Sequence, residues 1–310
     1  MILTFTPNPC VDKTVFIDRL EPGAKIRSSK YTCIPGGKGT NVSRAVKALG
    51  HESEAMVIVG GPTGRHVVDM IERQDGLPCI PLWVEGMTRT ITTVLEEPAH
   101  RQTAFFEPGP RVSKAEIEQI VATFEEAAPR ARVVTFNGTV PDPALRSLYA
   151  RLIRIAWDAE VVPILDTYGA ELASGLSAHP YMVKPNQTEA EGLLGFPLDT
   201  PGARRRAIDF FHERGVTLVV LSLGKDGALI SRDGERLLAT PPAIEEVNAV
   251  GSGDALVAAF AIGIEEDWPL EEMARMGVAA GAANAMSWDI GHLSRALVER
   301  IAAEVRIVRA

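Results

Sequence analysis

A glycine-rich turn that ends in an acidic residue is the clearest chemical signal in the sequence. The turn covers residues 248–254 and leads into an apolar stretch, 255–264, that is expected to be a helix. Its central residues are Gly251, Ser252 and Gly253. Glycines let the backbone turn tightly and bring N–H groups towards a ligand, and the partial positive charge of a helix N-terminus suits a phosphate. Asp254 is then either a capping carboxylate or a general base for a hydroxyl that attacks phosphorus.

A second glycine-rich turn, at residues 35–41, precedes another expected helix, at residues 41–49. It contains Gly36, Gly37, Lys38, Gly39 and Asn41. The spacing differs from that of a Walker A loop. Lys38 could pair with a phosphate, and the amide of Asn41 could donate to and accept from a sugar hydroxyl. Taken alone, such a cluster is more often only a turn.

Two further polar segments follow expected strands, where α/β proteins place their ligands. Lys184, Asn186 and Glu189 come after the strand expected at 181–183, and one turn of helix would put Asn186 and Glu189 on one face. Glu189 could hold the water shell of a Mg²⁺ ion, but the same spacing is that of a helix cap, and spacing alone favours neither. The second segment, 222–227, either binds a nucleotide or is a hairpin turn.

The composition excludes several classes of protein. The 310 residues are 46% hydrophobic and 23% charged, which excludes disorder, collagen and coiled coil as descriptions of the whole chain. The net charge of −8 argues against broad binding to nucleic acid or to acidic membranes, although a local basic pocket could still hold an anion. The three cysteines indicate a reducing compartment, and neither a signal peptide nor a membrane span is expected. The sequence therefore predicts a cytoplasmic enzyme or binding protein.

Short apolar runs alternate with helical patterns along the chain. The runs expected to be buried parallel strands are 2–5, 55–59, 132–136, 161–165, 181–183 and 216–221. Ser113 and Glu116 form a capping box for a helix that continues to about Ala127, and residues 141–158 are expected to form another helix. This alternation predicts one domain over residues 1–310, an α/β fold with a doubly wound, mainly parallel sheet flanked by helices.

The alternation fails in two places, at about 14–34 and 88–107, where strand patterns follow one another with no helix between them. These strands, expected at 14–18, 27–34, 88–95 and 103–106, could form a small sheet that acts as a lid, or only an irregular extra edge. A small sheet needs a partner surface to be stable, so we expect a homodimer through the lids, with a monomer as the alternative. The apolar lid residues expected to supply the interface are Phe16, Ile17, Ile91, Val94, Phe105 and Phe106.

The four strand-end motifs, in this order, resemble those of the ribokinase-like (PfkB-type) carbohydrate kinase family. Residues 36–41 and 248–254 look like the N-terminal and C-terminal signatures of the family, and the resemblance runs from about Ile2 to Met286. The opening residues 6–14 and Arg89 look like those of its hexose-phosphate kinases, such as the 1-phosphofructokinases and tagatose-6-phosphate kinases. A substrate that already carries a phosphate explains both Lys38 and Arg89, because a dianion in a partly closed site must be neutralised.

The resemblance implies an ATP-dependent kinase that uses Mg²⁺ to convert a hexose phosphate to a bisphosphate, with fructose 1-phosphate before tagatose 6-phosphate and fructose 6-phosphate. It implies Asp254 as the base, with the N–H groups of residues 251–253 stabilising the transferred phosphoryl group. The implied sugar-phosphate residues are Asp12, Lys25, Gly36, Gly37, Lys38, Asn41, Arg89 and Thr139. The implied nucleotide residues are Lys184, Asn186, Ser222, Gly224, Gly227, Val278 and Ala282. Glu189 and Asn186 are implied near the metal.

Three departures from the family pattern concern the choice of sugar more than the reaction. Thr139 stands in Asn137-Gly138-Thr139 where the subgroup usually has Ser-Gly-Ser, Tyr168 replaces a small residue, and Ala249 precedes the anion-binding turn. Two other functions stay open: a non-catalytic sensor of a sugar phosphate or nucleotide, and a nucleoside kinase. A sensor has no use for Asp254, and a nucleoside kinase leaves Lys38 and Arg89 unexplained.

Overall fold

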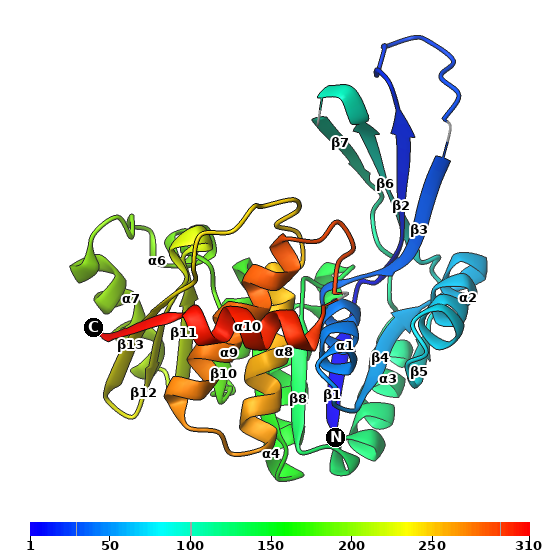
Figure 1. The fold of residues 1–310 in the computed structure, drawn as a ribbon. Coiled ribbons are helices and arrows are strands. Elements are labelled where there is room, and N and C mark those ends of the chain that lie inside the picture. The colour runs from blue at the N-terminus through cyan, green and yellow to red at the C-terminus, as the bar shows by residue number, and fades with distance from the viewer. Residues whose placement is uncertain (29, 100, 292) are drawn as a thin grey trace.

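The computed structural model describes residues 1–28, 30–99, 101–291 and 293–310. Within these residues the strands form a ten-stranded sheet, in the order β14-β13-β12-β11-β10-β9-β8-β1-β4-β5, and a four-stranded sheet, in the order β3-β2-β6-β7 (Figure 1). The strands of the large sheet are β1 (Ile2–Thr6), β4 (Ser53–Val59), β5 (Cys79–Trp83), β8 (Val133–Asn137), β9 (Val162–Asp166), β10 (Met182–Val183), β11 (Leu218–Ser222), β12 (Ala228–Arg232), β13 (Glu235–Thr240) and β14 (Arg306–Arg309). The helices are α1 (Lys38–Ala48), α2 (Gly61–Asp69), α3 (Lys114–Ala127), α4 (Leu148–Asp158), α5 (Gly169–Leu176), α6 (Gln187–Leu194), α7 (Pro201–His212), α8 (Ser252–Glu265), α9 (Leu270–Ala285) and α10 (Arg295–Glu304).

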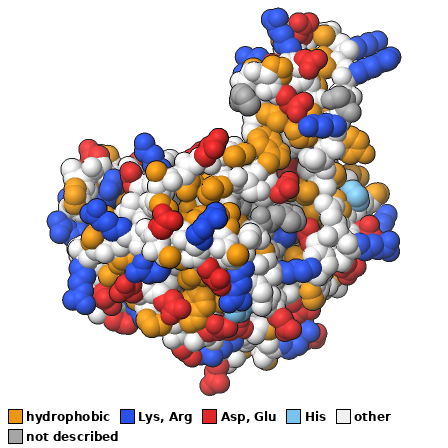
Figure 2. Space-filling model, in the orientation of Figure 1, with side chains coloured by type: hydrophobic (Ala, Val, Ile, Leu, Met, Phe, Trp, Pro, Cys, Tyr) orange, Lys and Arg blue, Asp and Glu red, His pale blue; other side chains and the backbone are white. Residues whose placement is uncertain are grey.

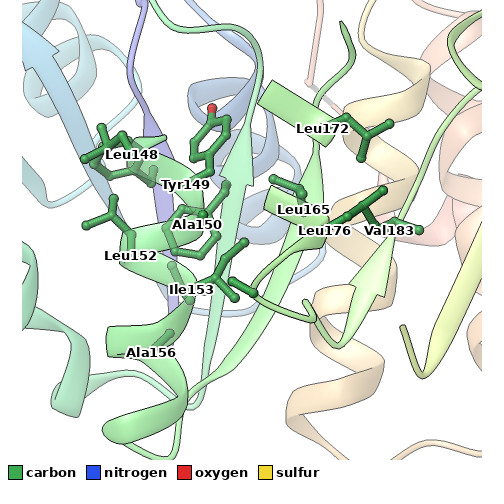
Figure 3. Packing of buried hydrophobic residues seen from close by; sticks show 14 of the residues in the cluster. Leu148, Tyr149, Ala150, Leu152, Ile153, Ala156, Leu165, Leu172, Leu176 and Val183 are labelled. Atoms are coloured by element: carbon green, nitrogen blue, oxygen red, sulfur yellow. The ribbon is translucent and has the colours of Figure 1, made fainter. Parts of the chain in front are cut away.

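The large sheet is buried on both faces. Successive residues of β1 point to opposite sides, so Leu3 and Phe5 belong to one apolar cluster and Ile2 to the other. Helices α3 to α7 contribute to the first cluster, whereas α1, α8, α9 and α10 contribute to the second. Figure 3 shows the first cluster, where Leu152 of α4 and Leu165 of β9 are among the labelled buried side chains. Helices on both faces confirm the expected doubly wound architecture.

The pairing of β4 with β1, and onward through β8, β9 and β10 to β11, is parallel, as predicted. Strand β5, which was not expected from the sequence, pairs with β4 in parallel. Strands β12, β13 and β14 extend the sheet by antiparallel pairs, and β13 and β14 were not expected from the sequence. Of the described helices, none is long and apolar enough to cross a bilayer.

Two expected helices differ in how well their starts were predicted. The capping box of Ser113 and Glu116 is present, and α3 ends at Ala127 as expected. The helix expected over 141–158 begins instead at Leu148. Asp142 caps a separate 3₁₀ turn over Pro143–Leu145 by accepting from the Ala144 N–H, so the chain turns once before α4 begins.

The small sheet is the lid sheet, made of β2 (Cys10–Ile17), β3 (Lys30–Gly36), β6 (Arg89–Glu96) and β7 (Arg101–Phe106). It confirms the second sheet expected from the sequence, and Figure 1 shows it projecting from the main body. Strand β2 pairs with β6 in parallel and with β3 in antiparallel orientation. The lid therefore joins two segments that are far apart in the chain.

The burial of the apolar lid residues corrects one expectation. Phe16, Ile17 and Ile91 are buried within the chain itself, with at most 8% of their surface exposed. Phe105 and Phe106, at the free edge on β7, are 57% and 68% exposed. The two groups could not be separated from the sequence, because the alternation of side chains across a strand does not say which positions a neighbouring element covers.

Candidate active site

The N-terminus of α8 presents Asp254 inside the protein. Gly251 caps the helix in a left-handed conformation, with φ of 84°, and makes no side-chain hydrogen bond. The capping role considered for Asp254 is therefore not the one observed. Asp254 lies in the first turn, is 5% exposed, and accepts a hydrogen bond of 2.8 Å from Asn41 Nδ2. The Ser252 N–H donates to the Ala249 carbonyl, so an anion at this turn would rely on Gly251 and Gly253 for backbone donors.

The surroundings of Asp254 raise its pKa to about 6. Burial is the largest cause, because it penalises the charged carboxylate, and the negative charge of Asp166 adds to it. The positive charge of Lys38, the hydrogen bond from Asn41 and the charge of Lys184 act in the opposite direction. A carboxyl with a pKa in this range is mostly ionised at neutral pH and yet basic enough to accept a proton.

Asp166, at the end of β9, is the main site residue that sequence reasoning missed. Its fully buried carboxylate forms ion pairs of 3.2 Å with Lys38 and with Lys184. Burial alone would raise the pKa of Asp166, but the two lysines outweigh that effect and lower it. Burial opposes the charge of Lys38 as well, yet the carboxylates of Asp166, Asp254 and Glu189 raise the pKa of its ammonium group. Lys38 therefore stays charged next to Asp254.

Lys184 and the α6 cap bring the third motif to the same place. A Cβ atom on Gly253 would lie 3.2 Å from Lys184 Nζ, so this ammonium group lies beside the first turn of α8. Asn186 and Glu189 form the capping box that was one of the two interpretations of their spacing. The Asn186 N–H donates to Glu189 Oε2, and the Glu189 N–H donates to Asn186 Oδ1. The described residues contain no group of three or more His, Cys, Asp or Glu side chains that could hold a metal.

The expected nucleotide residues lie on neighbouring elements. Ser222 ends β11 and forms an isolated bridge with Asn186, which joins the third and fourth motifs. Gly224 and Gly227 belong to the hairpin turn between β11 and β12, so the hairpin interpretation of this segment is the observed geometry. At Gly227, with φ of 88°, a Cβ atom would lie 1.9 Å from the Ala239 carbonyl oxygen. Val278 and Ala282 are buried on α9, which packs against α8.

A second charged group lies at the base of the lid. Arg89 Nη2 donates to the Asn8 carbonyl over 3.2 Å, and Arg89 Nε is buried with no hydrogen-bond partner among the described residues. Burial raises the pKa of Asp12, and the charges of Arg44 and Arg89 oppose that effect. Lys38 and Arg89, which were expected on one substrate phosphate, thus belong to two groups. Lys38 pairs with Asp166, whereas the charge of Arg89 opposes the rise in the pKa of Asp12.

The other residues expected to bind the sugar phosphate do not all lie at this site. Gly36 and Gly37 lie where β3 meets α1, and a Cβ atom on Gly37 would lie 2.7 Å from the Thr6 side chain. Thr139 is half-buried directly after Gly138, whose carbonyl accepts from the Tyr149 hydroxyl. Lys25 is the exception. It is exposed in the loop between β2 and β3, at the end of the lid away from Arg89, so one chain does not bring it to this site.

A cavity of about 470 Å³ separates one face of the lid from the main body. Asp12, Thr14 and Thr93 line it from the lid, and Asn248 and Ile290 line it from the segments around α8 and α9. Figure 2 shows the lid standing above a hollowed part of the surface. The volume lies within the range of pockets that hold small-molecule substrates.

Comparison with known proteins identifies the family of this chain. Residues 6–287 match the pfkB family carbohydrate kinase. A 1-phosphofructokinase of Xanthomonas campestris is 33% identical, over 98% of this chain and 97% of that protein. An ATP-dependent 6-phosphofructokinase isozyme 2 of Mycobacterium tuberculosis is also 33% identical, over 96% of this chain and 88% of that protein. The crystal structure of phosphofructokinase-2 from Escherichia coli in complex with potassium has a TM-score of 0.91 at 29% identity, covering 98% of both chains.

The class of protein that this fold and site define is a carbohydrate kinase, a phosphotransferase with an alcohol group as acceptor. The chain belongs to the pfkB family of carbohydrate kinases. The resemblance inferred from the four motifs, and the ribokinase-like fold that it implied, are confirmed.

Proposed function

We propose that this kinase transfers the γ-phosphoryl group of ATP to a hydroxyl of a hexose phosphate, giving a bisphosphate. Fructose 1-phosphate is the first candidate substrate, before tagatose 6-phosphate and fructose 6-phosphate. The observation that carries the proposal is the buried carboxylate of Asp254, which lies at a helix N-terminus, accepts from Asn41 and has Lys38 and Lys184 beside it. Relatives named 1-phosphofructokinase and tagatose-6-phosphate kinase support the substrate class.

Asp254 acts as the general base in this proposal. Asn41 Nδ2 donates to Asp254 Oδ2, so Oδ1 is the oxygen left to accept the proton of the attacking hydroxyl. The pKa of about 6 keeps this oxygen ionised at neutral pH. A positioned base of this kind contributes about 10²- to 10⁴-fold to the rate.

The N-terminus of α8 and the two lysines would stabilise the negative charge of the transferred phosphoryl group. The turn at residues 251–253 offers the backbone N–H groups of Gly251 and Gly253 as donors at a helix N-terminus, because the Ser252 N–H already donates to the Ala249 carbonyl, and Lys184 lies beside Gly253. Lys38 approaches from α1 and shares Asp166 with Lys184. Phosphoryl transfer requires the protein mainly to position the reacting groups and to stabilise their charge, and this arrangement supplies groups of both kinds.

Mg²⁺ fits the donor set at α6. The ion prefers oxygen ligands, keeps several waters, and is usually held by one or two carboxylates together with substrate phosphates. Glu189 would hold it or its water shell through Oε1, since Oε2 accepts the Asn186 N–H, and Asn186 would lie next to it. When bound, the ion would neutralise charge on the ATP phosphates.

The sugar phosphate would bind between α1 and the lid. Arg89 carries the buried, unpartnered Nε described above, and a phosphate oxygen would supply the missing acceptor. Asp12, Asn41 and the backbone of Gly36 and Gly37 would hold the sugar. A phosphofructokinase-2 structure from Escherichia coli in complex with fructose-6-phosphate supports a sugar phosphate as ligand of this fold. The nucleotide would lie on the other side, along Lys184, Asn186, Ser222, Gly224 and Gly227, with adenine near Val278 and Ala282.

The test is ATP turnover with fructose 1-phosphate, fructose 6-phosphate, tagatose 6-phosphate, the unphosphorylated sugars and a nucleoside, compared as kcat/KM. We expect kcat/KM for one hexose phosphate to exceed every unphosphorylated acceptor. Preference for a free sugar or a nucleoside would contradict the proposal. Binding of ATP and sugar phosphate without turnover would favour a sensor instead.

We also propose a homodimer formed through the lid sheets. The support is the large apolar side chains that the lid leaves exposed, namely Tyr31 at 64%, Phe105 at 57% and Phe106 at 68%. Tyr31 lies on the edge strand β3 and the two phenylalanines on the opposite edge strand β7, and large exposed apolar surface of this kind often marks an interaction site. A phosphofructokinase-2 relative from Escherichia coli is described in a tetrameric inhibited form, so assembly occurs among relatives.

A further inference from the structure

Arg44, on α1, is a buried cation to which neither the sequence motifs nor the proposed reaction assigns a role. Its side chain is 3% exposed and its guanidinium donates to groups on different elements. Nε donates to Asp75 Oδ2 over 2.8 Å, and Nη2 donates to the Pro35 carbonyl at the end of β3. Nη1 donates to Asn41 Oδ1 over 3.1 Å and to the Ile290 carbonyl over 2.9 Å.

The contact with Asn41 determines which way the Asn41 amide points. A guanidinium has only donors, so it must meet the amide oxygen and not the amide nitrogen. Arg44 therefore fixes Oδ1 towards itself, and Nδ2 is left to face Asp254 Oδ2 at 2.8 Å. With the opposite orientation, two donors would meet at Arg44 and two acceptors would meet at Asp254, and both contacts would be repulsive.

We propose that Arg44 is a positioning residue of the kinase, which holds the Asn41 amide in the orientation that donates to the base. The inference rests on the proposed role of Asp254 as general base. Arg44 lies one helical turn behind Asn41 on α1, and its bonds to Asp75, Pro35 and Ile290 hold the guanidinium in one place. A side chain fixed by that many partners restrains its neighbour without itself touching substrate.

The same guanidinium links the lid to the turn that carries Asp254. Pro35 belongs to β3 of the lid, and the segment at Ile290 continues into Gly291, whose N–H donates to Asn284 Oδ1. Asn284 Nδ2 in turn donates to the Val250 carbonyl, in the turn before α8. Arg44 therefore sits where the end of a lid strand, helix α1 and the turn that carries Asp254 meet.

The consequence is a change in the pH dependence of catalysis when Arg44 is lost. The charged groups that face Asp254 are Lys38 from α1, Asp166 from β9 and Lys184 after β10, and none of them is changed by a substitution at Arg44. The Asn41 hydrogen bond lowers the pKa of Asp254. An amide free to rotate no longer provides that bond, so the pKa of Asp254 rises and more of the base is protonated at a given pH.

The test is the pH profile of kcat in the variant Arg44→Met, Asp75→Asn. The second substitution removes the carboxylate that would otherwise stay buried without its cation. A hydrogen bond to a charged group corresponds to a shift of about one pH unit, so kcat at pH 6 should fall about fivefold further than kcat at pH 8. Arg44→Lys, which keeps a cation for Asp75 but lacks the guanidinium fork, is measured in parallel and should shift in the same direction.

Two controls separate positioning from loss of stability. Asp75→Asn alone keeps the Arg44–Asn41 contact. It should lower the melting temperature without shifting the acid limb of the pH profile, which is the fall in kcat as the pH decreases. Lys47→Met, on the same helix, removes a cation that donates to the backbone of Asp75 and Gly76 and should also leave the limb in place. If the double variant does not fold, Arg44→Lys with these controls decides the question.

The outcomes distinguish this inference from the proposed function. If the unmodified enzyme has an acid limb that Asp254→Asn removes, and the Arg44 variants leave it in place, the positioning role is refuted and the base assignment stands. If the unmodified enzyme has no such limb, the base assignment itself fails. An upward shift in the Arg44 variants, with none in the two controls, supports the inference.

Discussion

Replacing Asp166 with asparagine should change both the stability of the protein and the pH dependence of its reaction. The carboxylate of Asp166 is fully buried, and the side chain of its partner Lys184 is 3% exposed. Removing one member of a buried ion pair costs about 3–5 kcal/mol, because the remaining charge stays buried without compensation. Lys38 is 31% exposed and can turn towards water, so the loss comes mainly from Lys184.

The effect of Asp166→Asn on catalysis has a definite sign. The negative charge of Asp166 raises the pKa of Asp254, whereas Lys38 and Lys184 lower it. The substitution removes the first effect and leaves both lysines uncompensated, so the pKa of Asp254 falls below about 6. The base then stays ionised to lower pH, and the acid limb of kcat moves downwards. This direction is opposite to that expected for the Arg44 variants.

The assay combines urea denaturation with kcat at saturating substrates between pH 5 and pH 8. Asp209→Asn is the matched control for stability, because it breaks a partly exposed ion pair with Arg236 and should cost at most about 1 kcal/mol. An Asp166→Asn enzyme as stable as the control would refute the buried pairing with the lysines. An acid limb that stays in place or moves upwards would refute the electrostatic coupling to Asp254.

Three further predictions concern the sugar site, the lid and the nucleotide turn. Arg89→Ala should raise KM for the sugar phosphate about tenfold or more with little change in KM for ATP, since a charged hydrogen bond contributes about 1.5–3 kcal/mol; an equal rise in both KM values would place Arg89 elsewhere. Phe105→Asp with Phe106→Asp should convert a dimer to a monomer in sedimentation equilibrium while leaving the fold intact, and an intact dimer would move the interface away from these residues. Gly227→Ala should lower the melting temperature, because its Cβ would meet the Ala239 carbonyl at 1.9 Å and the backbone has positive φ; an unchanged melting temperature would show that the turn can relax.

Local patterns predicted the elements that depend on local chemistry. The capping box at Ser113 and the glycine turn before Asp254 need only neighbouring residues to form, and both are found where the sequence placed them. Asn186 shows the limit of such reasoning. Its spacing to Glu189 supported either a cap or a metal site, and the capping box is observed, but a cap does not exclude an ion on the free carboxylate oxygen.

The residues that sequence reasoning missed depend on distant partners. Asp166 ends a strand like many other aspartates, and its role follows only once Lys38 and Lys184 converge on it from elsewhere in the chain. Arg44 is one of many cations on helix surfaces in the sequence, and nothing local shows that it is buried among carbonyl groups. An ionisable residue directly after a buried strand was the available signal for Asp166.

The lid shows the same limit for apolar residues. Period-two patterns predicted its strands, but Phe16 and Ile91 are covered by their own chain while Phe106 is exposed. Ile91 and Phe106 are directly paired across β6 and β7, so the difference comes from the position in the sheet and not from the pattern. This is why the interface test uses the phenylalanines of the edge strand.

The most direct test of the central claim is the turnover of Asp254→Asn. The substitution is nearly isosteric, keeps an acceptor for Asn41 and removes only the basic oxygen, so we expect a folded enzyme that binds ATP with little change in affinity. Its kcat should fall by about 10²- to 10⁴-fold, the contribution of a positioned base. A variant that binds ATP normally and retains near-normal kcat would contradict the assignment of Asp254 as the group that accepts the proton.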